Sequence, residues 1–143
     1  MMAATGLEVF DRTLQITNVW LDEIMQELGP DRKHAWHVLG AVLHALRDRL
    51  PPGQAAHLGA QLPLLVRGLY YDGWRPQEPA HRARHLEPFL AEIEEGLRGT
   101  RPTGAERAAR AVFATIARHV SAGEVAKVVG VLPAELRALW PAS

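Results

Sequence analysis

Residues 41–70 read AVLHALRDRLPPGQAAHLGAQLPLLVRGLY, and residues 111–140 read AVFATIARHVSAGEVAKVVGVLPAELRALW. The two stretches align without a gap at an offset of seventy, and the match continues upstream at an offset of sixty-nine. The one-residue slip falls in a loop, where a true duplication would place it. We therefore predict one domain over residues 1–143, made of tandem units 5–75 and 85–141. A turn-rich basic linker, residues 72–84, joins them, and a pseudo-twofold axis relates them.

The aligned positions are mostly apolar, turn-forming or basic. Identical residues are Ala41/Ala111, Val42/Val112, Gly53/Gly123, Ala56/Ala126, Leu62/Leu132, Pro63/Pro133, Arg67/Arg137 and Leu69/Leu139. Upstream, Trp20-Leu21-Asp22-Glu23-Ile24 corresponds to Phe89-Leu90-Ala91-Glu92-Ile93. Such positions preserve packing and turns, so the duplication explains the fold rather than a reaction.

The apolar pattern is helical throughout. Residues three and four apart form one stripe in each copy, namely Val38, Leu39, Val42, Leu43, Leu46 and Leu50, then Ala108, Ala109, Val112, Phe113, Ile116 and Val120. Capping boxes start at Thr5, Thr103 and Ser121. Pro63 and Pro133 suit the first position of a short helix. We predict an all-α bundle of two four-helix repeats, with helices near 5–28, 30–50, 52–60, 62–71, 85–98, 103–119, 121–130 and 132–140.

Composition excludes several classes of function. The chain has 143 residues with 16 basic and 16 acidic side chains, so no net charge attracts nucleic acid or an acidic membrane. The absence of cysteine excludes disulfides and thiolate metal sites. There is no signal-peptide pattern and no apolar run long enough to span a bilayer. We expect a cytoplasmic protein that neither enters a membrane nor depends on nucleic acid.

Three motifs are distinctive. They are LPLLVRGLYYDGW at residues 62–74, LPAELRALWP at residues 132–141 and FDRTLQ at residues 10–15. Together they resemble the bacterial family catalogued as domain of unknown function 2267, over nearly the whole chain. The resemblance implies a compact helical bacterial protein. It implies no catalytic residue and no ligand.

The aromatic residues cluster at the end of the first unit. Tyr70, Tyr71 and Trp74 lie within five positions, although the chain has only nine aromatic residues. Tyr70 corresponds to Trp140, which indicates core packing, whereas the aromatic segment Tyr71-Asp72-Gly73-Trp74 has no similar segment in the second copy, which ends with Pro141-Ala142-Ser143. This segment is either an aromatic anchor for a partner or a plug that buries Trp74 between the two halves. The usual burial of large aromatics favours the plug.

Four charged residues recur in both units: Arg67 with Arg137, and Glu23 with Glu92. One interpretation is an anion-binding pair of arginines across the pseudo-twofold axis. A simpler one is a structural ion pair within each unit, Glu23–Arg67 and Glu92–Arg137. We favour the second, because it explains why both members recur.

Other chemistry lacks its usual residues. His37, His44 and Asp48 lie opposite the apolar stripe, so we place them on the solvent face and expect no metal there. His81 and His85 have helical ligand spacing, but Arg82 and Arg84 between them would repel a cation. The serines are Ser121, a cap, and Ser143, and there is no glycine-rich phosphate loop. We expect no catalytic residue and no cofactor.

The sequence favours a non-catalytic module that binds a protein partner or a second copy of itself. The candidate binding residues are Arg67, Tyr71, Asp72 and Trp74. One alternative is a small-molecule or metal-binding protein with a pocket between the halves, lined by Arg67, Tyr71 and Trp74. Another is a weak nucleic-acid binder that uses the basic linker.

Overall fold

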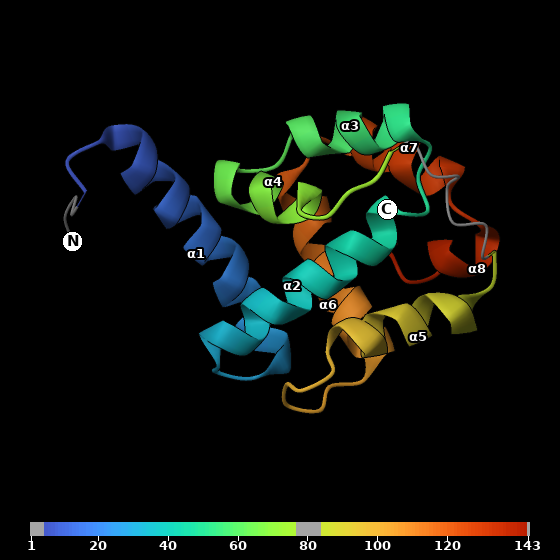
Figure 1. Ribbon diagram of the computed structural model, residues 1–143. Helices are drawn as coiled ribbons and strands as arrows, with labels where there is room; N and C mark the ends of the chain where they lie inside the picture. Colours follow the sequence, from blue (N-terminus) through green and yellow to red (C-terminus); the bar gives the residue numbers. More distant parts are fainter. Residues whose placement is uncertain (1–4, 77–83, 143) are drawn as a thin grey trace.

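A computed structural model describes residues 5–76 and 84–142 (Figure 1). Their helices are α1 (Glu8–Leu28), α2 (Arg32–Arg47), α3 (Pro52–Ala60), α4 (Leu64–Tyr71), α5 (Leu86–Gly96), α6 (Ala105–His119), α7 (Ala122–Val131) and α8 (Ala134–Arg137). No strand occurs in these residues, so the predicted all-α fold class is confirmed. We call α1–α4 the first half and α5–α8 the second half.

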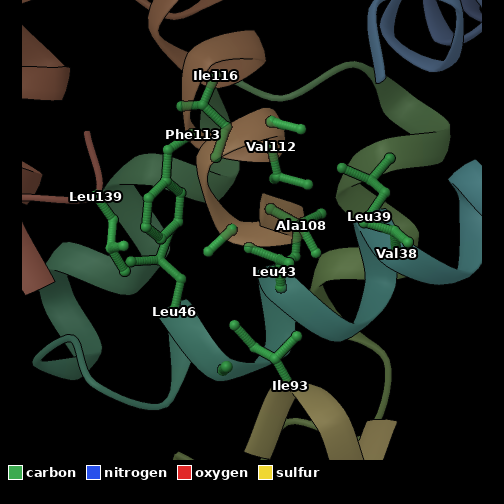
Figure 2. Close-up of a cluster of buried hydrophobic side chains, with 14 of the residues drawn as sticks. Val38, Leu39, Leu43, Leu46, Ile93, Ala108, Val112, Phe113, Ile116 and Leu139 are labelled. Atoms are coloured by element: carbon green, nitrogen blue, oxygen red, sulfur yellow. The ribbon is translucent and has the colours of Figure 1, made fainter. Parts of the chain in front are cut away.

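The two predicted apolar stripes form the centre of the core. They lie on α2 and α6, which pack against each other, with α5 contributing Ile93 and the C-terminal segment Leu139 (Figure 2). The central residues of both stripes, including Leu43 and Phe113, are completely buried. Burying a side chain of this size contributes about 1.5–3 kcal/mol, so this layer is a main source of stability.

The two halves are interleaved. The opening helix of each half packs on the second helix of the other half as well as on its own: α1 lies on α6, and α5 lies on α2. Further on, α3 and α7 lie side by side (Figure 1). Gln54 of α3 donates a 2.6 Å hydrogen bond to Glu124 of α7, and the two residues occupy equivalent positions of the two copies, seventy residues apart. The pseudo-twofold axis itself stays a prediction.

The start signals were only partly correct. Ser121 caps α7, because its hydroxyl accepts a hydrogen bond from the backbone N–H of Glu124. The other two predicted capping boxes do not form. α1 starts after Leu7, and α6 starts after Gly104 without a side-chain cap. The Thr103 hydroxyl instead bonds to His34 Nε2 at 2.6 Å.

The short helices also differ in detail from the prediction. Pro63 and Pro133 precede their helices as N-caps, with extended ψ angles of 154° and 149°. The last helix is much shorter than predicted and covers only Ala134–Arg137. His44 was placed on the solvent face, and this was wrong. It is half-buried, and its Nε2 bonds to the Leu69 carbonyl at 2.7 Å, because α4 packs over that side of α2.

Candidate functional site

The predicted aromatic candidates pack on each other. The Tyr71 hydroxyl donates to the Ala56 carbonyl of α3 at 3.4 Å, so the ring lies over that helix. Trp74 is half-buried, with its ring centre 5.3 Å from that of Tyr71. The Asp72 backbone carbonyl accepts a hydrogen bond from Arg47 at 2.9 Å. All these contacts lie within the chain, so residues 71–74 have a packing role in the fold.

The recurring arginines bind backbone carbonyls rather than carboxylates. Arg67 donates to Gly59 and Leu62 at 3.0 and 2.8 Å, and Arg137 donates to Leu132 at 2.9 Å. The last carbonyls of a helix lack intrahelical partners, and a guanidinium fork can reach several of them. Each arginine therefore closes the C-terminal end of the preceding helix, α3 or α7.

The predicted ion pairs Glu23–Arg67 and Glu92–Arg137 were therefore wrong. Glu23 bonds to Arg118 and to His119 Nε2, the latter at 2.8 Å, and Glu92 bonds to Arg49 Nη1 at 2.8 Å. The physical reason is the interleaving. It brings each opening helix against the end of the second helix in the other half, so the glutamates meet basic residues there.

The two contacts correspond position by position. Arg49 also lies over the Phe89 ring, 5.2 Å from its centre. In the other contact, His119 stacks on Trp20 at 5.4 Å. Because Phe89 corresponds to Trp20 and His119 to Arg49, each contact combines an aromatic ring, a glutamate and a basic side chain. We assign both contacts a structural role, since they join elements of opposite halves.

Sequence reasoning missed an exposed apolar surface at the start of α1. Leu7, Phe10 and Leu14 are 52%, 48% and 44% exposed. We call these three residues the α1 tip. They continue, at alternating spacings of three and four, the stripe that Leu21 and Leu28 bury further along α1. In Figure 1 the first part of α1 extends away from the other helices.

A sequence signal for the α1 tip did exist. The stripe begins at Leu7, whereas the corresponding helix α5 begins at Leu86, the position equivalent to Thr17. Within the described residues, α5 therefore has no part that corresponds to the first two turns of α1. Leu64 and Leu65 of α4, 49% and 39% exposed, lie beside this region, because the Leu65 backbone N–H donates to Thr13 at 3.2 Å.

A groove of about 770 Å³ opens on the second half, mainly between α6 and α7. Its lining is mostly alanine and valine, with Trp140 and two arginines: Ala114, Ala117, Arg118, Ala122, Val125, Ala126, Val129, Gly130, Arg137, Trp140, Pro141 and Ala142. We call it the α6/α7 groove. An apolar concave surface of this size is suited to bind side chains of another molecule.

A second, more polar cleft of about 420 Å³ lies at the start of α2. Arg98, Arg101 and Lys33 line it, but so does Asp31, which caps α2 by accepting the His34 backbone N–H. That hydrogen bond is the main reason that the pKa of Asp31 is lowered. An anion at this helix end would meet the charged carboxylate. Burial is the main cause of the lowered pKa of His34 nearby.

The histidines that the sequence offers as metal ligands are the remaining candidates. Across residues 5–76 and 84–142, no group of three or more histidine, aspartate and glutamate side chains could hold a metal ion. His81 and Arg82 lie outside the described residues. His85 bonds to Glu135 at 3.1 Å, and the pKa of Glu135 is lowered, chiefly by a hydrogen bond from the Leu86 backbone N–H.

None of the helices in the described part of the chain is long and apolar enough to cross a bilayer. A comparison with curated proteins finds no match. A family model described as "Uncharacterized conserved protein (DUF2267)" matches residues 17–139, starting just beyond the α1 tip. Because this match covers most of the chain, the chain belongs to the DUF2267 family.

Proposed function

We propose that this protein is a non-catalytic helical module that associates with a second copy of itself, and that the α1 tip makes the contact. The observation that carries the proposal is the exposure of Leu7, Phe10 and Leu14, at 44–52%, on a helix that buries the rest of the same stripe. Apolar patches rimmed by polar residues are typical of protein interaction sites.

The surroundings of the α1 tip enlarge this surface. Leu64 and Leu65 of α4 add two exposed apolar side chains beside it. Glu8 and Asp11 lie in the first turn of α1, so the apolar surface has an acidic border. A helix without cover on its apolar face is stabilised by association, since burial of a phenylalanine or leucine contributes about 1.5–3 kcal/mol.

The alternatives have less support. A pocket lined by Arg67, Tyr71 and Trp74 would need these groups to point toward a ligand. Instead, the arginine and the tyrosine bond to α3 carbonyls, and the tryptophan packs on the tyrosine. Nucleic-acid binding through the linker would rest partly on residues outside those that the structure describes. Neither alternative has a feature comparable to the α1 tip.

Sedimentation velocity across a concentration series tests the proposal. We expect the wild-type chain to sediment as a dimer or larger assembly, and Phe10→Gln/Leu14→Gln to sediment as a monomer. Loss of two apolar contacts of about 1.5–3 kcal/mol each weakens association at least tenfold. The matched control is Ile16→Gln/Val19→Gln, 39% and 42% exposed on the other side of the same helix.

Circular dichroism must show equal helix content in all variants; the melting temperature is not the control, because association itself stabilises the wild-type chain. A wild-type chain that remains monomeric at high micromolar concentration would refute the proposal. Equal association of the wild type and the α1 tip variant would refute it as well.

A further inference from the structure

The α6/α7 groove is open because small residues line it. In the first half, the positions equivalent to Ala114, Ala117 and Pro141 are His44, Arg47 and Tyr71. Each of these larger side chains packs against its own half. Arg47 is 5% exposed and donates to the Tyr70 and Asp72 carbonyls, both at 2.9 Å.

Tyr71 fills the corresponding place most directly. A Cβ atom on Gly59 would come within 2.6 Å of the Tyr71 ring, so the ring lies directly against α3. Gly59 corresponds to Val129, which lines the groove in the second half. The first half thus shows an aromatic ring and a long side chain against the helices equivalent to those of the groove. A groove of this kind accommodates large side chains supplied by another molecule.

We infer that the α6/α7 groove binds the α1 tip of a second copy. This inference rests on the proposed self-association and names the surface that receives the tip. Phe10 and Leu14 are four residues apart on α1, and Leu7 is the N-cap three residues before Phe10; anchors at such spacing are typical of an amphipathic helix that binds an apolar groove. A cavity of about 150 Å³ already accommodates benzene. The groove, at about 770 Å³, has room for three such side chains.

Charge also matches between the two surfaces. Glu8 and Asp11 lie in the first turn of α1, beside the apolar stripe. Arg137 lines the groove and is exposed, so its guanidinium carries the positive charge there, whereas the other lining arginine, Arg118, is paired with Glu23. Complementary charge of this kind orients a partner and excludes wrong ones. It favours the α1 tip over an apolar segment with a basic border.

The α1 tip cannot fill the groove of its own chain. Glu23 bonds to Arg118 at one end of the groove, and Phe10 lies thirteen residues before Glu23 (23 − 10) on the same helix. At 1.5 Å per residue, this is about 20 Å along a rigid helix. The contact therefore joins two different surfaces, the α1 tip of one copy and the groove of another.

A mixing experiment tests this geometry. The tip variant is Phe10→Gln/Leu14→Gln, and the groove variant is Ala117→Arg, which introduces the side chain that the first half has at Arg47. We expect each variant alone to associate at least tenfold more weakly than the wild type in sedimentation velocity. We expect an equimolar mixture to form a heterodimer, because one intact tip and one intact groove remain.

A second groove variant controls for the possibility that Ala117→Arg disturbs folding. Ala126 is exposed on α7 and lines the groove, so Ala126→Arg should fold normally and weaken association to the same extent. The matched control is Ala56→Arg, an exposed residue at the corresponding position of α3, which should associate like the wild type.

The outcomes separate the two proposals. If both groove variants associate as tightly as the wild type while the tip variant does not, the inference is wrong and self-association through the tip stands. If the tip and groove variants both fail alone and their mixture also fails, the tip of one copy does not bind the groove of the other, and the inference is again wrong. If the tip variant associates normally, both proposals fail.

Discussion

Removing the carboxylate of Glu92 should destabilise the fold more than removing the arginine that it neutralises. The Arg49 side chain is only 1% exposed, whereas that of Glu92 is 32% exposed. Among the described residues, Arg49 Nε and Nη2 have no hydrogen-bond partner. A buried guanidinium lowers stability when it is paired with a carboxylate and lowers it further when it is unpaired. The informative result is therefore which of the two substitutions, at Glu92 or at Arg49, destabilises the fold more.

The magnitudes follow from burial. Breaking a fully buried ion pair from one side costs about 3–5 kcal/mol. Because Glu92 is partly exposed and solvent screens it, we expect Glu92→Gln to lower the free energy of unfolding by about 2–3 kcal/mol. Arg49→Met removes the buried charge and keeps an apolar stem. It loses a cation–π contact with Phe89 but gains a sulfur–aromatic one, for a net change within about 1 kcal/mol.

Urea denaturation followed by circular dichroism measures both variants and the double variant Arg49→Met/Glu92→Gln. The double variant should be close to Arg49→Met, since the glutamine no longer leaves a charge unpaired. Glu95→Gln is the control. Its ion pair with Arg98 is exposed at 65% and 78%, and its loss should change stability by less than about 0.5 kcal/mol. If Arg49→Met were the more destabilising of the two substitutions, the reasoning would be wrong.

Two further predictions concern packing and pH. Gly59→Ala should lower the free energy of unfolding by about 1–3 kcal/mol, because its Cβ would meet the Tyr71 ring. Gly68→Ala, which has open space around it on α4, should raise the free energy of unfolding by at most about 1 kcal/mol. Thermal melts of the two variants test this difference. Burial lowers the pKa of His34 from its ordinary value of 6.5. The unfolded chain therefore binds a proton at His34 more readily than the folded chain does. The contribution of His34 to stability is present above pH 6.5 and is lost as the pH falls below it. His34→Gln should therefore show a shallower loss of stability in acid, by up to about 1.4 kcal/mol per pH unit, and equal slopes in urea titrations would contradict this.

The helices could be predicted because their signals are local. The stripes around Leu43 and Phe113 and the cap at Ser121 depend on neighbouring residues, and each is in place. The pairing of Glu23 could not be predicted in the same way. An alignment of two copies shows which positions are equivalent but not which half supplies the neighbour, and here His119 of the opposite half supplies it.

The candidate surfaces depend even more on tertiary structure. The apolar spacing through Phe10 is visible in the sequence, but whether another helix covers it is not. Arg67 recurs at an aligned position, and its partners are backbone carbonyls, which have no signature in side-chain patterns. The α6/α7 groove results from small residues such as Ala117. Their importance is visible only in the structure, where the larger residue at the equivalent position, Arg47, packs against the end of α4.

The interleaving of the two halves has a consequence for synthesis of the protein. Trp20 of α1 stacks on His119, ninety-nine residues further along the chain (119 − 20), so this cover is absent until α6 has been made. At about 5–20 residues per second on the ribosome, the delay is about 5–20 seconds. During that time the nascent chain carries α1 with much of its apolar face exposed. A chain of this topology folds late and as a whole, because neither half can complete its core before the other has emerged.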